Sequence, residues 1–287
     1  MTDLLCYGAL CADNLIRLPH FPRPNSGVRA LSDQMLPGGN ALNEARCLAA
    51  WGTSLVLMGD DLGYDPEGEL LFQAISATPQ IDASYLRRSA KVRTPLCRIM
   101  ITPDGMRTVL AVRSNDHSAP SIPADLLANV QLVSVTRFGA GTLAAAQAAR
   151  EAGKTLVIGD ALLLDEPFAA LADVIVGSVD YLRNDQSIEA QLRALHALRG
   201  AAVIVTDGPR PVHVLINDDY QQFQPHAIEP VDTSGAGDCF RAGITYGLSQ
   251  SWDWQRTIEW ALASAALWCS KGANTPPSPS EFEHYLS

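Results

Sequence analysis

Basic residues and long apolar runs are both scarce in this 287-residue chain. Lysine and arginine number 21 against 31 acidic residues, the net charge is −10, and the sequence has no basic patch typical of nucleic-acid-binding domains. No run of 18 or more apolar residues occurs, and residues 1–5 lack the basic and apolar regions of a secretory signal. We therefore expect a cytoplasmic protein that acts neither on nucleic acid nor in a membrane.

Cysteine motifs and the common phosphate-transfer signatures are also absent. The six cysteines form no Cys-x-x-Cys pair and have no zinc-like spacing to histidine, so we expect most of them to be reduced, buried thiols. The sequence contains neither a Gly-x-x-x-x-Gly-Lys-Ser/Thr phosphate loop nor a His-Arg-Asp catalytic loop. These absences argue against structural zinc domains, P-loop enzymes and protein kinases.

The most informative segment that is present spans residues 232–238, where Gly235-Ala236-Gly237 leads into an apolar helical stretch. Small residues leave backbone N–H groups accessible, and at a helix N-terminus such groups bind anions. Asp238, beside that anion site, is suited to accept a proton from a hydroxyl. The segment predicts phosphoryl transfer to an alcohol, and from these residues alone the alternative is a glycine turn without chemistry.

Short apolar runs alternate with helical patterns along the chain, and 47% of the residues are hydrophobic. The expected strands are 4–7, 54–58, 131–135, 155–158, 174–176 and 202–205. The expected helices are 41–51, 67–77, 143–152, 187–198, 239–248 and 257–269. This alternation predicts one α/β domain over residues 1–287, with three α/β/α layers and a mostly parallel central sheet.

Two stretches, about 14–36 and 91–113, interrupt the alternation. The first contains three prolines, and the second alternates apolar and polar residues around a Pro103-Asp104-Gly105 turn. Residues 98–101 and 108–112 are expected to pair as antiparallel strands. Together the two stretches predict a small β-sheet that acts as a lid outside the main sheet.

A second glycine-rich segment, Gly38-Gly39-Asn40, precedes the predicted helix 41–51. Asn40 and Asn43 are three residues apart, so they lie on one face near the helix start, where their amides can hydrogen-bond sugar hydroxyls. A capped helix start without ligand binding is an equally open interpretation, because glycine and asparagine are ordinary residues there.

Together the two glycine-rich segments resemble the signatures of the ribokinase-like carbohydrate kinases, the PfkB family. Residues 38–45 and 59–63 match the upstream signature, and residues 232–238 match the downstream one. The resemblance extends from residue 4 to about residue 274. It implies a ribokinase-like fold with a β-sheet lid, ATP as phosphoryl donor, and a sugar hydroxyl as acceptor.

The resemblance also implies roles for individual residues. Asp238 would be the catalytic base, and the amides of Gly235, Ala236 and Gly237 would hold the charge of the transferring phosphoryl group. The acceptor ligands would be Asp13, Gly39, Asn40 and Asn43. The nucleotide ligands would be Thr206, Gly208, Ala263, Ala266, Gly272 and Asn274. The candidate cation ligands are Asp232, for a monovalent ion such as K⁺, and Asp160, for the Mg²⁺ network.

The sequence departs from the family pattern at two places. Where the family often has Asn-x-x-Glu, linked to Mg²⁺, this chain has Ser178-Val179-Asp180-Tyr181. Pro211 replaces the second glycine of a Gly-x-x-Gly that follows the nucleotide-binding strand. Ketohexokinase and sulfofructose kinase members also depart at the first motif, and residues 135–138 resemble that branch. Arg137 is therefore a candidate ligand for the substrate or for an anionic group on it.

Residues 131–160 carry a competing pattern. Gly139-Ala140-Gly141 follows a predicted strand and opens a helix, and Asp160 ends the next strand 21 residues after Gly139. This arrangement fits the dinucleotide-binding fingerprint, which makes an NAD-dependent dehydrogenase an alternative.

The sequence as a whole predicts an ATP-dependent sugar kinase. Because the chain is acidic, binding of ATP requires a metal ion or local positive charge, which indicates Mg²⁺. A nucleoside kinase of the same fold stays open, as does a non-catalytic sugar- or nucleotide-binding relative, which the two departures suggest. The resemblance also implies a homodimer that pairs through the lid. The lid arginines expected to influence substrate choice are Arg17, Arg29, Arg98 and Arg113.

Overall fold

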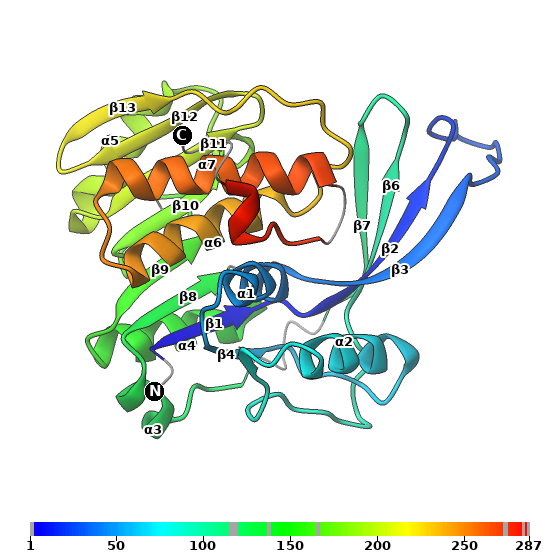
Figure 1. Cartoon of the computed structure of the whole chain (residues 1–287), viewed down its shortest axis with the longest axis horizontal. Helices are drawn as coiled ribbons and strands as arrows, with labels where there is room; N and C mark the ends of the chain where they lie inside the picture. Colours follow the sequence, from blue (N-terminus) through cyan, green and yellow to red (C-terminus); the bar gives the residue numbers. More distant parts are fainter. Residues whose placement is uncertain are drawn as a thin grey trace.

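Two β-sheets organise the computed structural model, which describes residues 3–114, 120–136, 139–164, 167–271, 275–282 and 285 (Figure 1). A nine-stranded sheet has the strand order β13-β12-β11-β10-β9-β8-β1-β4-β5, and a four-stranded sheet has the order β3-β2-β6-β7. Helices cover both faces of the large sheet. The predicted three-layer α/β/α fold with a separate small sheet is therefore confirmed.

The large sheet is parallel from β5 through β11. Its strands are β1 (Leu4–Gly8), β4 (Leu55–Gly59), β5 (Ile81–Asp82), β8 (Leu132–Thr136), β9 (Thr155–Gly159), β10 (Val174–Ser178), β11 (Ala202–Asp207), β12 (Arg210–Ile216) and β13 (Asp219–Phe223). The antiparallel hairpin β12–β13 extends one edge and was not predicted. Its outer strand is largely polar and lies at the sheet edge, so its sequence resembles that of a loop.

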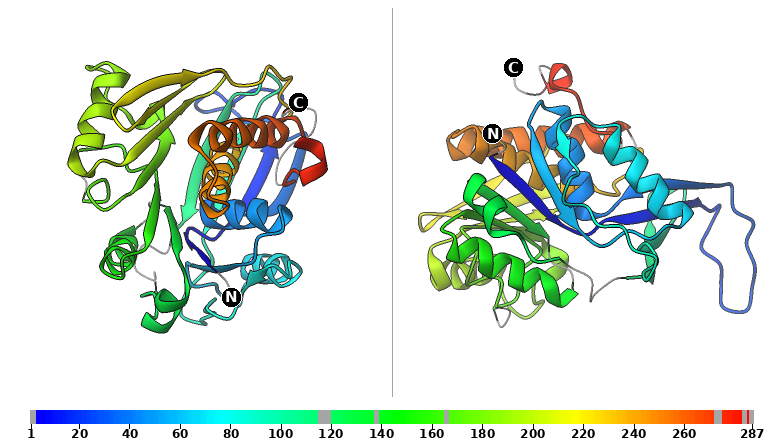
Figure 2. Two further views of the ribbon diagram at one scale, coloured as in Figure 1. Left: turned by 60° about the vertical axis from the view of Figure 1, so that its left-hand side comes forward. Right: turned by 90° about the horizontal axis from the view of Figure 1, so that it is seen from below.

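Each face of the large sheet has its own helix layer and its own hydrophobic core (Figure 2). One layer contains α1 (Asn40–Ala50), α2 (Pro66–Ser76), α6 (Ala236–Ser249) and α7 (Trp254–Lys271), and the other contains α3 (Ala124–Asn129), α4 (Gly139–Glu151) and α5 (Ile188–Arg199). Successive side chains of a strand point to opposite faces, so Cys6 of β1 packs into the first core while Leu5 and Tyr7 pack into the second.

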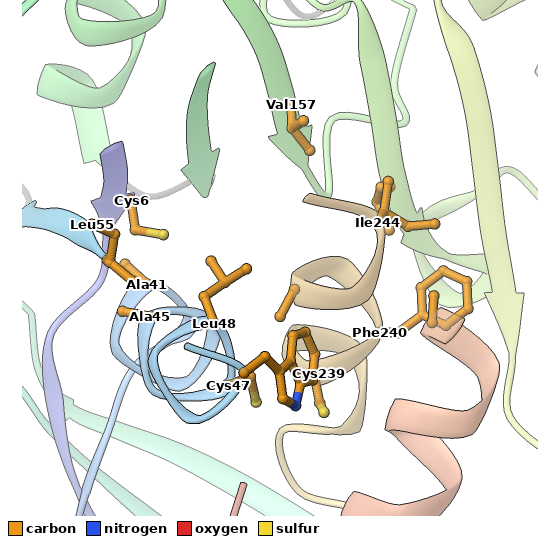
Figure 3. Packing of buried hydrophobic residues seen from close by; sticks show 14 of the residues in the cluster. Cys6, Ala41, Ala45, Cys47, Leu48, Leu55, Val157, Cys239, Phe240 and Ile244 are labelled. Atoms are coloured by element: carbon orange, nitrogen blue, oxygen red, sulfur yellow. The ribbon is translucent and has the colours of Figure 1, made fainter. Parts of the chain in front are cut away.

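Helices α1 and α6 pack against each other inside the first core. Figure 3 shows Cys47 and Leu48 of α1 close to Cys239 of α6, and the thiols of Cys47 and Cys239 lie within hydrogen-bond reach. Two short 3₁₀ helices, η1 (Val179–Tyr181) and η2 (Pro279–Phe282), complete the described elements. Within the ranges given above, none of the helices is long and apolar enough to cross a membrane.

The small sheet projects away from the main body (Figures 1 and 2). Its strands are β2 (Cys11–Arg17), β3 (Ser32–Gly38), β6 (Leu96–Ile101) and β7 (Arg107–Arg113). Strands β6 and β7 pair antiparallel, as predicted, whereas β2 and β6 are parallel neighbours. Strand β2 begins at Cys11, before the predicted lid segment, so the lid strand continues almost directly from β1.

Glycines allow α6 and α7 to approach closely. A Cβ on Gly243 would lie 2.5 Å from Cα of Ala261, and a Cβ on Gly247 would lie 2.4 Å from Oγ1 of Thr257. Both distances are too short for any side chain, so these glycines set the spacing of the two helices and, through it, the position of α6.

Gly243→Ala is expected to lower the free energy of unfolding by about 1–3 kcal/mol, because the added methyl group meets the backbone of α7. This loss outweighs the higher helix propensity of alanine, which is worth about 1 kcal/mol. Urea unfolding measures the change. Gly27→Ala, where nothing lies within 4 Å of the added carbon, is the matched control. Equal stability of the two variants would contradict the close-contact explanation.

Candidate active site

A cavity of about 470 Å³ lies between the lid and the carboxyl ends of β1 and β4. The starts of α1 and α6 and one face of the lid also line it, although these segments are far apart in the sequence. Ligands of open α/β sheets bind at this carboxyl edge. The predicted site residues that line the cavity are Asp13, Gly39, Asn40, Asn43, Gly235 and Asp238.

Gly235 determines how α6 begins. It is the N-cap residue, with a left-handed φ of 81°, and a Cβ there would lie 2.9 Å from Cζ2 of Trp268. The buried Trp268 ring is held by a 2.7 Å hydrogen bond from its Nε1 to the Ser234 carbonyl. The Ala236 N–H donates to the Thr233 carbonyl at 3.2 Å, so this one of the three predicted anion-binding amides is engaged within the turn itself.

The start of α1 holds the carboxylate of Asp238. Gly39 has a φ of 98°, and a Cβ there would lie 2.4 Å from the Ala9 carbonyl oxygen, so only glycine brings α1 this close to the end of β1. Asn40 Nδ2 donates to Oδ1 of Asp238 at 3.0 Å, and Asn43 Nδ2 donates to Oδ2 at 2.9 Å. The two asparagines predicted to bind the acceptor therefore also orient this carboxylate.

A buried ion pair that the sequence analysis missed lies next to Asp238. Arg241 Nε donates to Glu44 Oε2 at 2.9 Å, and Arg241 Nη2 lies 3.3 Å from Asp238 Oδ1. Arg241 is 2% exposed and Glu44 is 0% exposed, and the Thr245 hydroxyl donates to Glu44 Oε1 at 2.7 Å. Gly159 makes room, because a Cβ there would lie 2.9 Å from Arg241 Nη1. The available signal was an acidic and a basic residue in each of two helices that are otherwise uncharged, Glu44 and Arg46 in α1 and Asp238 and Arg241 in α6.

The pKa of Asp238 reflects opposing influences. Burial raises the pKa of the carboxyl above its usual value, while the Arg241 guanidinium and the hydrogen bonds from Asn43 and Asn40 act in the opposite direction. A carboxylate that binds a proton more readily than usual, yet is held in one orientation by three donors, suits the role of a general base.

Asp13 faces the same cavity from the lid strand β2. A Cβ on Gly38 would lie 1.9 Å from Asp13 Oδ2, so the neighbouring strand needs glycine beside this carboxylate. Burial and then the charge of Asp238 raise the pKa of Asp13 to about 7, against a hydrogen bond from Cys11 that lowers it. Asp13 therefore gains or loses its charge near neutral pH.

The lid touches the loop that precedes α6. Arg107 Nη1 donates to Oγ1 of Thr233 at 2.6 Å, and Arg17 Nη2 lies 3.9 Å from Oδ2 of Asp232. Arg107 also lines the cavity, as does Arg113, whereas the sequence analysis named only Arg113 of these two. No local motif marks Arg107, because its position depends on the pairing of β6 with β7.

Asp232 and Ser234 each have a buried oxygen that accepts no hydrogen bond within the described ranges. Oδ1 of Asp232 accepts the Ser234 N–H at 2.8 Å, while Oδ2 of Asp232 and Oγ of Ser234 have no partner in the part of the chain that the structure describes. Such a pair of oxygen donors fits a hard cation. Asp160, the other predicted cation ligand, follows β9 with a left-handed φ of 60°.

The predicted nucleotide ligands do not share one environment. Thr206, near the end of β11, donates its hydroxyl to the Gly177 carbonyl at 3.2 Å, and Gly208 turns the chain into β12 with a φ of 56°. Ala263 is 0% exposed within the first core, so its side chain packs in the interior. Ala266 of the same helix is also buried. The predicted ligands outside the described residues are Arg137, Gly272 and Asn274.

The segment that departs from the Asn-x-x-Glu motif forms η1. Ser178 caps it by accepting the Asp180 N–H at 3.3 Å, and Asp180 itself is exposed. Tyr181, which the sequence analysis did not single out, lines the cavity. The departure therefore replaces two metal-linked side chains with a capped turn and an aromatic wall.

An α/β/α domain with a lid over a polar cavity at its carboxyl edge belongs to the class of ribokinase-like folds. A profile of the pfkB family carbohydrate kinases matches residues 1–281, and the chain belongs to that family.

Relatives of known activity agree with this assignment. The chain is 22% identical over 284 residues to a ribokinase from Haemophilus influenzae, which covers 93% of this chain and 92% of that protein. It is 25% identical over 282 residues to a nucleoside kinase from Methanothermobacter thermautotrophicus, with coverages of 92% and 88%. The structure of Arabidopsis thaliana ribokinase complexed with ribose and ATP superimposes with a TM-score of 0.82 at 21% identity and covers 99% and 98% of the two chains.

The chain is therefore an ATP-dependent kinase of a sugar or a nucleoside, as predicted. Membership of this kinase family argues against the alternative of an NAD-dependent dehydrogenase. The segment that prompted that alternative opens α4 with Gly139, on the opposite side of the sheet from α1 and α6.

Arg241→Met is expected to lower the free energy of unfolding by about 3–5 kcal/mol, because it leaves the buried Glu44 carboxylate without its partner. Urea unfolding measures the loss, and Glu44→Gln combined with Arg241→Met should lose less than Arg241→Met alone. Arg193→Met, which breaks an exposed pair with Glu189, should cost below about 1 kcal/mol. Similar losses for Arg193→Met and Arg241→Met would contradict a special role of the buried pair.

Asp13→Asn is expected to stabilise the protein at pH 8, by at most about 4 kcal/mol. The pKa of Asp13 in the folded protein, about 7, lies above its ordinary value of 3.8, so folding favours the protonated carboxyl. The stability that this protonated form contributes is complete below about pH 4 and is lost as the pH rises through 7. At pH 8 the wild-type protein therefore buries a charged carboxylate, which asparagine removes. Urea midpoints at pH 5 and pH 8 measure the effect, and the gain should shrink at pH 5.

The control for this pH dependence is Asp104→Asn. A hydrogen bond from Thr102 holds the pKa of exposed Asp104 below its usual value, so removing this carboxylate should bring no gain as the pH rises from 5 to 8. A gain from Asp13→Asn that is identical at both pH values would rule out the proposed titration.

Proposed function

We propose that this kinase transfers the γ-phosphoryl group of ATP to a hydroxyl of a small sugar, with Asp238 as the general base. The observation that carries this proposal is the shared cavity of Asp238 and Asp13, with Asp238 in the first turn of α6. A helix N-terminus attracts negative charge, so the transferring phosphoryl group is expected at the start of α6. Asp238 is in the first turn of the same helix, so the base lies next to both the phosphoryl group and the attacking hydroxyl.

Polar groups around the cavity have separate roles in the proposed reaction. The Asp13 carboxylate and Oδ1 of Asn43, which has no hydrogen-bond partner among the described residues, accept hydrogen bonds from acceptor hydroxyls and orient the sugar. Asp238 takes the proton of the attacking hydroxyl while Asn40 and Asn43 hold its two oxygens in place. The amides of Gly235 and Gly237 and the α6 dipole take up charge that develops on the phosphoryl oxygens.

The proposed reaction uses two kinds of cation, Mg²⁺ and K⁺. Mg²⁺ bound with ATP supplies charge neutralisation on the phosphate oxygens. The carboxylates of Asp160 and Asp180, which follow β9 and β10, are the hard oxygen donors that suit it. The buried Oδ2 of Asp232 and Oγ of Ser234 accept no hydrogen bond within the described ranges, which supports a K⁺ site beside the loop of residues 232–235, although the Arg17 guanidinium lies 3.9 Å from Asp232 Oδ2.

The lid side of the cavity includes an apolar surface beside its polar residues, and this surface favours a compact acceptor with a carbon face. Its apolar lining residues are Leu15, Leu36, Ile99, Val109 and Ala111. Such a wall accommodates the carbon atoms of a sugar ring while Asp13 and Asn43 take its hydroxyls. The same wall suits a nucleobase, so a nucleoside is the second candidate acceptor.

The outer face of the lid supports a homodimer. Val109 and Ala111 face the cavity, so Leu110 and Val112 of the same strand face outward, where they are 49% and 45% exposed. Met35 of β3 lies on the same outer face. Apolar side chains gathered on one sheet face favour pairing with a second copy. The cytoplasmic location is part of the same proposal, supported by free cysteines that are mostly buried.

Asp238→Asn is expected to lower turnover by roughly 10²–10⁴-fold, because the amide cannot take the hydroxyl proton. A panel of sugars, ketoses and nucleosides with coupled ADP detection identifies the acceptor and measures the loss. ATP binding, followed by calorimetry, should stay unchanged. Asp185→Asn, at an exposed position, is the control and should leave turnover intact.

Two outcomes would contradict the proposal. Turnover of the Asp238→Asn variant at the wild-type rate would remove Asp238 as the base. Wild-type protein that binds a sugar and ATP but yields no ADP with any acceptor would instead establish the non-catalytic alternative.

A further inference from the structure

Two cysteines and a carboxylate gather on the lid wall of the acceptor cavity. Strands β2 and β6 are parallel neighbours, with Asp13 opposite Cys97 in the register. Cys11 precedes Asp13 by two residues and therefore points to the same face of the sheet. Cys11, Asp13 and Cys97 all line the cavity, so the three side chains share one surface that small solutes reach.

The three side chains are close enough to bind one ion. One ligand atom from each of Cys11, Asp13 and Cys97 lies within 4.8 Å of the other two. The Cys11 thiol lies within hydrogen-bond reach of both Cys97 and Asp13. Around Zn²⁺, bond lengths of about 2.3 Å to sulfur and about 2.0–2.2 Å to oxygen put tetrahedral ligand atoms about 4 Å or less apart. The 4.8 Å limit exceeds that spacing by less than about 1 Å, which rotation about the side-chain bonds of Cys11 and Cys97 would have to close.

The donor set selects the kind of ion. Two sulfur ligands and one carboxylate oxygen favour thiophilic cations of the Zn²⁺ class, whereas Mg²⁺ and K⁺ prefer oxygen ligands only. Three protein ligands leave the fourth tetrahedral position open toward the cavity, where water or a hydroxyl can bind. The site is therefore chemically distinct from the cation sites beside the anion loop.

A disulfide between the two cysteines fits the backbone less well than a shared ion. Cys11 and Cys97 are offset by two residues on adjacent parallel strands, and a strand spacing of about 4.8 Å with a rise of about 3.3 Å per residue puts their Cα atoms about 8 Å apart. A disulfide requires Cα atoms about 4.4–6.8 Å apart, so its formation would move the lid strands. The ligand atoms of Cys11, Asp13 and Cys97, in contrast, already lie within 4.8 Å of one another.

We propose that Cys11, Asp13 and Cys97 form a binding site for one thiophilic divalent cation and that the bound cation excludes the acceptor from the cavity. Exclusion follows because the ion occupies the Asp13 carboxylate and the space in front of it. This second part rests on the proposed role of Asp13 in acceptor binding, whereas the ion site itself does not.

The first test measures ion binding to the reduced protein without ATP or acceptor. Titration with Co²⁺ should produce one equivalent of a tetrahedral spectrum with a thiolate-to-cobalt charge-transfer band, and Zn²⁺ should displace it. Cys97→Ser and Cys11→Ser should each weaken Co²⁺ binding by more than the roughly 10–100-fold typical of changes around the ligands. Cys47→Ala is the matched control, because it removes one thiol of the buried Cys47–Cys239 pair, which has no cavity access.

A second measurement uses only wild-type protein, so its result does not depend on whether the variants fold. In wild-type protein, Zn²⁺ should slow alkylation of Cys97 at least about tenfold, and Mg²⁺ at the same concentration should not. A charge-transfer band that forms in Cys97→Ser with the wild-type affinity for Co²⁺, or no band in reduced wild-type protein, would overturn the ion site. Loss of two thiols on oxidation, without any Co²⁺ binding, would identify the pair as a disulfide instead.

Exclusion of the acceptor is tested separately, at saturating Mg²⁺ and ATP. Zn²⁺ should raise the KM for the acceptor with little change in kcat, and Cys97→Ser should need at least about tenfold more Zn²⁺ for the same effect. Equal inhibition of wild type and Cys97→Ser would overturn the exclusion while leaving the spectroscopic result intact. Absence of kinase activity in the uninhibited wild type would refute the proposed function, and the Co²⁺ titration would still decide the ion site.

Discussion

The contact among Arg241, Glu44 and Asp238 is the constraint on which the rest of the active site depends. Buried charges are stable only when they are paired, so the guanidinium on α6 must meet the carboxylate on α1. That pairing holds the two helices in one relative position. It brings two glycine-rich helix starts, nearly two hundred residues apart, to the same end of the sheet and leaves Asp238 in reach of Asn40 and Asn43.

The lid forms a part of the cavity wall that the starts of α1 and α6 do not line. Side chains alternate along its strands, so one face carries Asp13, Cys97 and Val109 into the cavity while the other presents Leu110 to the outside. One sheet therefore contributes the proposed acceptor ligand Asp13, a thiol pair and an apolar outer surface. Arg107 links this sheet to the loop before α6 through a hydrogen bond to Thr233, which couples the position of the lid to the proposed site of phosphoryl transfer.

Much of the fold could be predicted because its central strands are buried on both faces and appear as short apolar runs. The hairpin β12–β13 was missed because its outer strand, Asp219–Phe223, lies at the sheet edge and is mostly polar. Gly39 and Gly235 could be identified as candidate site residues because the local backbone geometry of two helix starts requires glycine, and both line the cavity. Arg107 was missed because its role depends on strand pairing rather than on its neighbours in the chain.

The sequence by itself determined the fold class, the two glycine-rich helix starts and the identity of Asp238 as candidate base, because all three depend on short-range backbone and helix chemistry. Only the tertiary structure decided which charges pair in the core and which side chains share the cavity wall. The spacing of the cysteines showed no metal motif, yet strand register brings Cys11 and Cys97 to the same carboxylate. Contacts between distant segments depend on the packing of the whole sheet, which local sequence patterns do not encode.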